Sequence, residues 1–230
     1  MLANGDGAGV LVLVVPVLLF GGALALGIVL HRRRVEALRR WAAATGWTYV
    51  GSDASLVRRW RGQPFGQGHA QRTSDVLVGT FEGARALSFA YAWTTGSGKD
   101  QSTHTAHVVA LGLPTALPWV EVTPQGLGAR LAKVFGAQDI DFELQEFNDA
   151  FRVASGDARV AHAIIHPRHM EALLAGPRLP WRIEGADVLT WRLGGTDLAA
   201  IHPALVALRD VRDAVPRHVW QDHGWDPAAR

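Results

Sequence analysis

The stretch GAGVLVLVVPVLLFGGALALGIVL, residues 7–30, decides how this 230-residue chain is organised. It contains no charged residue, and a helix of this length extends ~36 Å, enough to cross a hydrocarbon core of ~30 Å. Backbone groups inside lipid must be hydrogen-bonded within the segment, so a helix is the expected form. We therefore predict a transmembrane helix over 7–30, preceded by a short extracytoplasmic tail at 1–6.

Arginines follow the apolar stretch directly. Residues 31–61 contain eight Arg against Glu36 and Asp53, whereas residues 62–230 contain 15 basic and 18 acidic residues. Because the positive flank of a membrane helix stays inside, we expect the N-terminus outside and the remaining chain in the cytoplasm, anchored to the cell membrane by a single pass. The residues expected to set this topology are Arg32, Arg33, Arg34, Arg39 and Arg40.

A cleaved signal peptide is the alternative, and it would make the rest of the chain an exported domain. The small residues around Ala23 and Ala25 are the site that a signal peptidase would use. Against this alternative, no Lys or Arg precedes the apolar run, the run is too long, and arginines follow at once.

A basic juxtamembrane helix is expected over residues 31–46, with Gly46 as its C-terminal stop. Residues 47–220 show no linker, repeat or low-complexity stretch, and a segment of this length can bury one core alone. We expect one cytoplasmic α+β domain there, with a largely antiparallel sheet and several short helices, followed by a flexible tail at 221–230.

Residues 47–123 read mainly as strands. SDVLVGTF (74–81) and ARALSFAYAW (84–93) predict a hairpin around Glu82-Gly83. In the second segment large and small side chains alternate, which predicts that the large ones share a core face. These large residues are Leu87, Phe89, Tyr91 and Trp93. Further strands are expected at 47–50, 104–113 and 119–123.

The second half is richer in helix signals. Asp157 is the expected N-cap of a short helix, and Pro167 should end that helix and begin another that closes at Gly176. An amphipathic helix is expected from Pro203 to Val215. Strands are expected at DIDFEL (139–144) and FRVAS (151–155), and a hairpin at WRIEGADVLTW (181–191).

Three segments carry a family resemblance: DIDFELQEFNDAFRV (139–153), AHAIIHPRHMEALL (161–174) and WRIEGADVLTW (181–191). In this order they resemble uncharacterised single-pass membrane-anchored proteins of actinobacteria. The second half, residues 120–215, is also similar to a broader bacterial domain of unknown function. The resemblance implies a bacterial protein with a single domain, and it brings no activity, cofactor or catalytic residue with it.

Ten His raise the question of a metal site. His162, His166 and His169 lie close in sequence, and neutral imidazoles are common zinc ligands. The first two have the spacing of a zinc-binding helix, but no Glu lies between them and Pro167 breaks the helix at once. We therefore expect structural or surface roles, with His166 capping the second helix, and keep zinc as the alternative.

Asp139, Asp141 and Glu143 would share one face of the predicted strand, where carboxylates can hold Mg²⁺ or Ca²⁺. The calcium-loop pattern fails because Leu144 stands where Gly is required, and a solvated strand face explains the alternation. TTGSGKDQST (94–103) lacks the residues of a phosphate-binding loop and is expected to be a hairpin loop. We predict no cofactor and assign no catalytic residue.

Composition narrows the function further. The absence of Cys excludes disulfides, thiolate metal sites and a cysteine nucleophile, and the acidic balance of residues 62–230 argues against nucleic acid as a partner. We predict a membrane-tethered, non-enzymatic binding or scaffold module whose partners are the lipid bilayer and an unidentified protein. The alternatives are a membrane-associated hydrolase that uses acidic or His residues, and an exported domain. The oligomeric state stays open.

Overall fold

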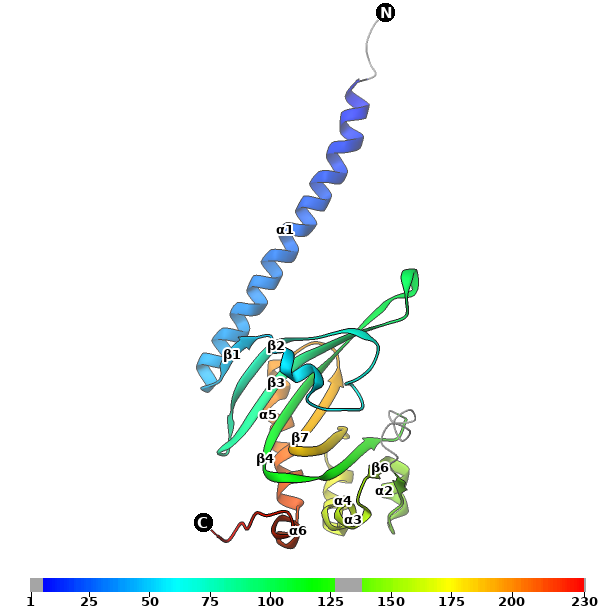
Figure 1. The fold of residues 1–230 in the computed structure, drawn as a ribbon. Coiled ribbons are helices and arrows are strands. Elements are labelled where there is room, and N and C mark those ends of the chain that lie inside the picture. The colour runs from blue at the N-terminus through cyan, green and yellow to red at the C-terminus, as the bar shows by residue number, and fades with distance from the viewer. Residues whose placement is uncertain (1–5, 127–137, 230) are drawn as a thin grey trace, which may run out of the picture.

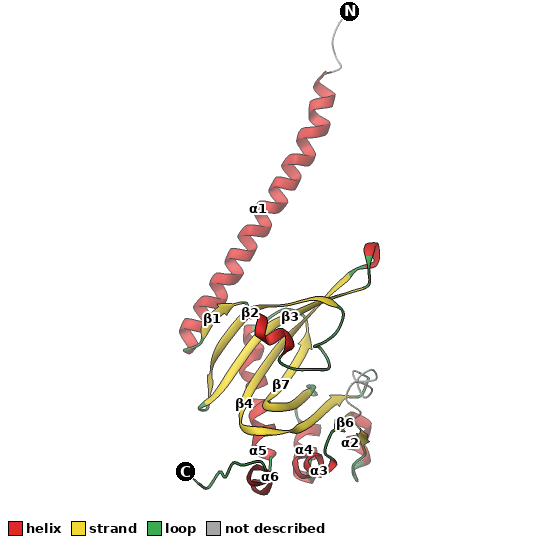
Figure 2. Ribbon diagram, viewed as in Figure 1, coloured by secondary structure: helices red, strands yellow, loops and turns green. Residues whose placement is uncertain are grey.

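The computed structural model describes residues 6–126 and 138–229, with side chains for residues 21–126 and 140–229. A long helix, α1 (Asp6–Thr45), projects from a bent sheet that has helices packed behind it and at its lower end (Figures 1 and 2). The strands are β1 (Thr48–Gly51), β2 (His69–Phe81), β3 (Ala84–Thr95), β4 (Ser102–Pro124), β5 (Gln138–Ile140), β6 (Phe151–Ser155) and β7 (Trp181–Leu193). The shorter helices are α2 (Gln145–Ala150), α3 (Ala158–Ile164), α4 (Pro167–Ala175), α5 (Ile201–Ala214) and α6 (Arg217–Asp222).

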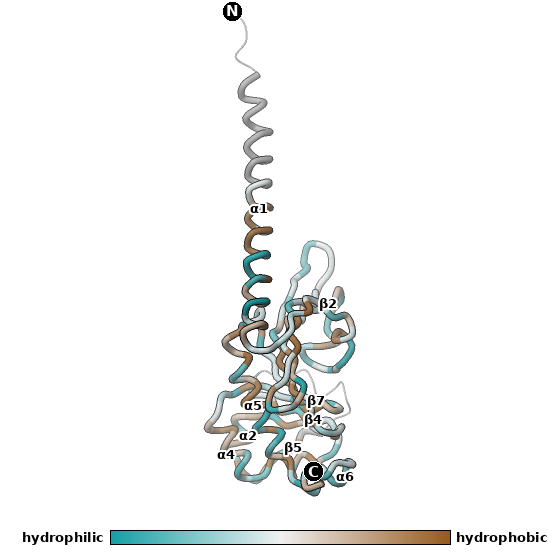
Figure 3. The backbone as a smooth tube through the Cα atoms, turned by 90° about the vertical axis from the view of Figure 1, so that its left-hand side faces the viewer, coloured by the Kyte–Doolittle hydropathy of each residue, from teal (hydrophilic) through white to brown (hydrophobic). Residues whose placement is uncertain are grey.

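The described strands pair antiparallel throughout, which confirms the predicted α+β class with a largely antiparallel sheet. The helix expected to end at Gly46 does so: α1 stops at Thr45, and Gly46 adopts the left-handed conformation, with φ of 73°. The side chains of residues 7–20, which make up more than half of the transmembrane stretch predicted at 7–30, lie outside the described residues. Across the residues that the structure describes, no helix has both the length and the apolar run needed to cross a membrane. Figure 3 shows apolar turns of α1 giving way to hydrophilic turns before the helix reaches the sheet.

One strand, β4, organises the whole sheet. It is a single strand of 23 residues instead of the two predicted at 104–113 and 119–123. Its first half pairs with β3 and β7, and its second half pairs with β7 and β6. Register shifts between Gly112 and Val120 mark the bend, which lets one strand serve both ends of the sheet.

The hairpin predicted at 181–191 is wrong, because β7 is one continuous strand along β4. Gly185 adopts a φ of 61°, but the chain bends there without reversing. The strand predicted at 139–144 is shorter than expected, since β5 ends at Ile140. The cause is the Asn148 side chain, which accepts from the backbone N–H of Phe142 (3.0 Å) and donates to its carbonyl (2.7 Å), holding a turn before α2.

Each face of the sheet has its own core. One face packs against α5 and the end of α1, and the other is closed by the segment 54–65. Leu87, Phe89, Tyr91 and Trp93 all lie in the second core, as the alternation predicted. The aromatic rings there are closely packed: Trp60 stacks on Phe89 at a centroid distance of 5.9 Å, and Phe65 meets Tyr91 edge-on at 4.8 Å.

Several local predictions are confirmed. β2 and β3 form the expected hairpin, with Glu82 and Gly83 at positive φ in the turn. The side chain of Asp157 accepts from the N–H groups of Arg159 and Val160 at the start of α3, and Pro167 is the first residue of α4. These turn and capping signals act between residues close in sequence, so they do not depend on the tertiary contacts of the rest of the chain.

Candidate functional site

The junction between α1 and the sheet joins the N-terminal helix to the domain. Leu38 and Ala42 are buried in the core between the sheet and α5. Arg34 forms an ion pair with the buried carboxylate of Asp75 on β2, and its Nε donates to that carboxylate at 2.9 Å. Asp75 adopts a positive φ of 54° at a bulge in β2, which turns its side chain out of the regular alternation. The last turns of α1 are therefore part of the domain.

The five arginines expected to set the topology differ in their contacts. Besides Arg34, Arg39 lies over the ring of Tyr49 at 5.7 Å, and Arg40 donates to the carbonyl of Glu36 at 3.4 Å. Arg32 and Arg33 are exposed and make no ion pair within the described part of the chain. Two of the five thus bind the domain, and two are free to meet another partner.

A buried ionic cluster lies on the opposite face of the sheet. Arg182 is fully buried, and its Nε lies 3.1 Å from Glu121 across the β4–β7 pair. Its Nη1 lies 3.5 Å from Glu184, its Nη2 donates to the carbonyl of Gln63, and its guanidinium lies 5.0 Å from the centre of the Trp191 ring. Burial raises the pKa of Glu121 and of Glu184, and it lowers the pKa of Arg182 while the two carboxylates oppose that shift.

The segment 54–65 closes over this cluster. Arg59 pairs with Asp187 at 2.8 Å, and the indole N–H of Trp60 donates to the same carboxylate at 3.1 Å. The backbone N–H of Arg61 donates to Glu184 at 3.1 Å. These bonds connect the segment 54–65 to β7, so the ionic cluster stabilises the position of this segment on the sheet.

Ser88 and His107 form a second buried polar pair, which bears on the hydrolase alternative. Ser88 Oγ lies 2.8 Å from His107 Nε2, and the backbone N–H of Asp197 donates to Nδ1 at 3.5 Å. This assigns the ring proton to Nε2, so His107 donates to the serine. Burial lowers the pKa of His107 to about 4. A nucleophilic serine needs a base that accepts its proton and a path to substrate. In this tautomer Nε2 of His107 carries the proton and cannot accept another, and burial of both side chains closes the path to substrate.

The three His considered as zinc ligands have separate roles. His169 is buried, its Nδ1 donates to the carbonyl of Ile164 at 2.8 Å, and its ring stacks on Trp181. His166 caps α4 as predicted, accepting from the N–H of His169 at 3.3 Å. His162 is exposed and packs against Phe142. The structure therefore gives each ring a contact with the protein itself.

The strand face predicted to carry the acidic candidates does not extend to Asp141 and Glu143, because β5 ends at Ile140. Asp141 and Glu143 are exposed in the loop between β5 and α2, and the side chain of Asp139 lies outside the described residues. Within the described part of the chain, no group of three His or acidic side chains is placed to hold a metal ion.

Two hollows open on the helix-bearing side. A cavity of about 90 Å³ lies between α4, α5 and β7, and its lining is mostly apolar. A larger open cleft of about 950 Å³ lies between the β2–β3 turn, the bend of β4 and the C-terminal segment. Its apolar residues include Leu113, Val215, Trp220 and Trp225, and its charged residues are Glu82, Arg85, Arg212, Asp213 and Arg217.

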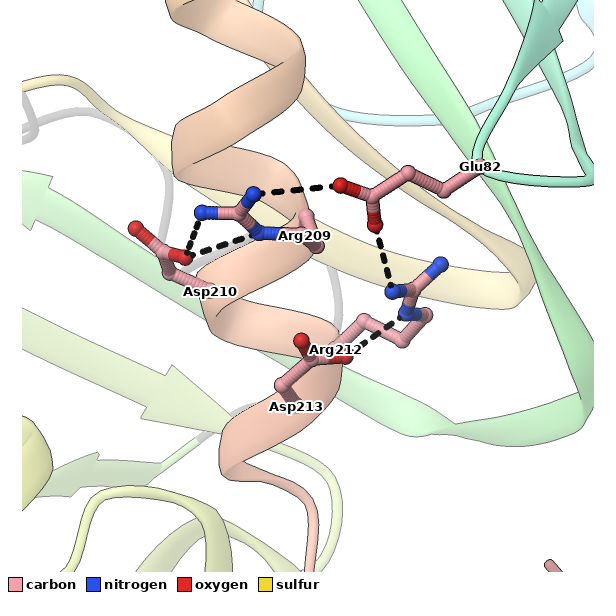
Figure 4. A network of polar contacts seen from close by, with 5 residues as sticks. All are labelled: Glu82, Arg209, Asp210, Arg212 and Asp213. Atoms are coloured by element: carbon pink, nitrogen blue, oxygen red, sulfur yellow. Dashed lines mark hydrogen bonds and ion pairs between the residues drawn. The ribbon is translucent and has the colours of Figure 1, made fainter.

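An ion-pair network forms one wall of this cleft. Glu82, at the β2–β3 turn, lies 3.1 Å from Arg209 and 3.3 Å from Arg212, both on α5 (Figure 4). Asp210 also pairs with Arg209, and Asp213 also pairs with Arg212. The network fixes the turn against α5. The C-terminal segment is held as well, because Asp226 pairs with Arg217 at 3.1 Å and Trp225 packs edge-on against Trp220.

Sequence reasoning missed the buried polar groups. Glu121 and Arg182 each interrupt an apolar strand within two residues of a Trp, in WVEV and WRI. A charge inside a buried strand is the signal that a partner lies on the neighbouring strand. Ser88 and His107 gave no comparable signal, since each is compatible with an exposed strand position.

No protein-family model matches the chain, and no curated protein matches it. Among solved structures, the fold is found again in a mycobacterial transport factor. That protein is the trehalose monomycolate transport factor A, TtfA; its crystal structure superposes with a TM-score of 0.61 at 16% identity, covering 77% of this chain and 91% of that one. The likeness establishes a shared fold. The neighbour is actinobacterial, like the proteins that the sequence resembles.

Proposed function

We propose that this chain is a membrane-tethered, non-enzymatic binding module that acts as an accessory to lipid transport at the cell envelope. The observation that carries the proposal is the packing of α1 onto the sheet through Leu38, Ala42 and the Arg34–Asp75 pair. The same unbroken helix contains the apolar stretch 7–30, so an anchor inserted there holds the domain as one body. The fold shared with a trehalose monomycolate transport factor supports the accessory role.

In this proposal residues 7–30 cross the cell membrane, with the N-terminus outside and the domain in the cytoplasm. The support is the cluster of arginines that follows the apolar stretch, of which Arg32 and Arg33 are exposed. The Ser88–His107 pair supports a non-enzymatic role, because both side chains are buried away from substrate and Nδ1 of His107 accepts a backbone N–H.

The cleft of about 950 Å³ is the proposed site for a protein partner. Its lining includes Arg217 and Trp220 of α6, and α6 lies at the end of the domain away from the N-terminal part of α1 (Figure 1). An apolar floor with a charged rim is the usual composition of a protein–protein contact. Arg85 is exposed at this rim and has no ion pair among the described residues, so an acidic group of a partner can meet it.

The test uses the full chain in native membranes with a photo-crosslinking residue at Pro114, which is exposed at the cleft, or at Ala199, which is exposed elsewhere. We expect a defined crosslinked protein from Pro114 that disappears with Arg85→Glu, and none from Ala199. The chain should stay with the membrane after a carbonate wash, and Ser88→Ala should still support envelope lipid transport in a deletion strain. Release by carbonate, or loss of transport with a folded Ser88→Ala protein, contradicts the proposal.

A further inference from the structure

The tip of the β3–β4 hairpin stands free of the sheet. β3 and β4 stay paired as far as Thr95 and Ser102, whereas the pairing of β2 ends at His69 opposite Thr94, and that of β7 ends at Leu193 opposite Ala106. The segment beyond Thr95 therefore has no neighbouring strand in the described part of the chain. Its tip, a short turn at Gly98–Asp100, points to the same side as the N-terminal part of α1 and lies beyond the rest of the domain (Figures 1 and 2).

The tip reaches the level of the apolar turns of α1. Arg34 pairs with Asp75, and the adjacent Ser74 lies opposite Ala90, so this turn of α1 is level with the middle of β3. From Ala90 to Thr95, the last residue of β3, the strand alone advances ~17 Å, whereas α1 needs only ~6 Å to rise from Arg34 to Leu30. The tip would fall short of Leu30 only if β3 ran nearly perpendicular to α1, and Figure 1 shows the two running in similar directions.

The chemistry of the tip suits the headgroup layer of a bilayer and not its interior. Residues 95–102, TGSGKDQS, contain hydroxyl, amide and charged groups and no apolar side chain, and such groups are costly in hydrocarbon. Lys99 is exposed at the tip, and Arg72 is exposed on β2 near the base of the hairpin. Arg32 and Arg33 are exposed on α1 within one turn of Leu30, so four exposed cations without ion pairs among the described residues lie on the elements at this end of the domain.

We propose that the hairpin is a second membrane contact, in which Lys99 and the polar tip bind anionic phospholipid headgroups beside α1. The inference rests on the proposed membrane tether and adds a partner for a surface that the tether alone leaves unused. Each cation near an anionic surface strengthens attraction about fivefold. Two contacts hold the domain at one tilt, so the cleft beside α6 faces away from the lipid.

The experiment uses the full chain, whose lack of Cys allows single labels to be placed without removing any residue. A fluorophore is attached at Ser97→Cys on the tip, at Gly22→Cys on α1, where an added side chain meets nothing, or at Ala228→Cys near the C-terminus. The protein is reconstituted in phosphatidylcholine vesicles with or without about one-third phosphatidylglycerol, an anionic lipid. Lipids with a spin-labelled headgroup act as quencher for the Ser97→Cys and Ala228→Cys labels, and lipids with a spin-labelled acyl chain act as quencher for the Gly22→Cys label.

We expect the Ser97→Cys label to be quenched at least twofold more than the Ala228→Cys label, and more with phosphatidylglycerol than without. Lys99→Glu should reduce this quenching and Asp100→Asn should increase it, while inorganic phosphate leaves it unchanged. A Ser97→Cys label quenched no more than Ala228→Cys, with Gly22→Cys quenched, overturns the hairpin contact and leaves the tether standing. An unquenched Gly22→Cys label removes the tether and this inference together. Circular dichroism of the Lys99 and Asp100 variants shows that the fold is intact.

Discussion

Arg182 and Glu121 lie directly opposite each other on β7 and β4, with the guanidinium Nε 3.1 Å from the carboxylate and both side chains buried. Burying a charge costs desolvation free energy, and in a buried ion pair each charge compensates the cost of the other. The pair therefore stabilises the bent part of the sheet only as a unit, and the loss of one member costs more than the loss of both.

Replacing the arginine alone should be strongly destabilising. Arg182→Met leaves Glu121 and Glu184 without their common cation, and we expect the free energy of unfolding to fall by ~3–5 kcal/mol. The double variant Arg182→Met, Glu121→Gln should recover part of this loss. Denaturant unfolding of the full chain in detergent, followed by tryptophan fluorescence, measures both. A double variant less stable than Arg182→Met contradicts the paired arrangement.

Removing the carboxylate at the α1 junction should loosen the helix more than it weakens the fold. Arg34 is half exposed, so Asp75→Ala should cost only ~1 kcal/mol. The distance distribution between spin labels at Gly27→Cys and Ala116→Cys should broaden, because α1 loses its ionic contact with β2. Glu36→Ala, an exposed residue on the same helix, is the matched control and should leave the distribution narrow.

Stability should fall with acidification between pH 6.5 and pH 4. His107 stays neutral in the folded chain because burial lowers its pKa to about 4, whereas the unfolded chain takes up the proton near pH 6.5. The unfolded state therefore binds more protons in this window, and folding loses up to ~3 kcal/mol as the pH falls through it. His107→Gln should flatten the pH dependence of urea unfolding. A residual slope of the same sign belongs to His169, whose pKa is also lowered by burial.

A side chain at Gly79 should disturb the start of the sheet. An added Cβ would lie 2.4 Å from Cδ2 of the Trp47 ring, and Trp47 is itself packed edge-on against Trp41 of α1. We expect Gly79→Ala to cost ~1–3 kcal/mol and to change the tryptophan emission spectrum, because the ring must move. Gly156→Ala is the control, since its Cβ would meet nothing and its φ is ordinary. Equal melting temperatures for the two variants would contradict this packing.

Local patterns in the sequence were sufficient for the parts of the fold that depend on neighbours in the chain. The alternation around Phe89 predicts a core-facing strand, and Asp157 predicts a helix start, because both effects act within a few residues. The continuity of β4 could not be predicted, since Pro114 and Pro118 read as a break. They fall where the register shifts, and there a missing N–H does not interrupt the ladder.

The candidate sites depend on distant parts of the chain, which limits what the sequence can predict. Gly185 has the same local signal in a reversing turn and in a bend, and only the presence of β4 alongside decides between them. Similarly, the cleft needs the Glu82 turn, the bend of β4 and Trp225 to meet. No spacing pattern within one segment contains that information.

The shared strand β4 has a consequence for how this protein can be divided. A shorter domain that began near residue 120, as the sequence resemblance suggested, would start inside the second half of β4. A gene fragment starting there would lack residues 106–112, with which the last part of β7 pairs. The unpaired edge of β7 would then be exposed to solvent, and exposed strand edges promote aggregation. The chain is thus expected to melt in a single transition and to be inherited as a whole, with no shorter portable piece inside it.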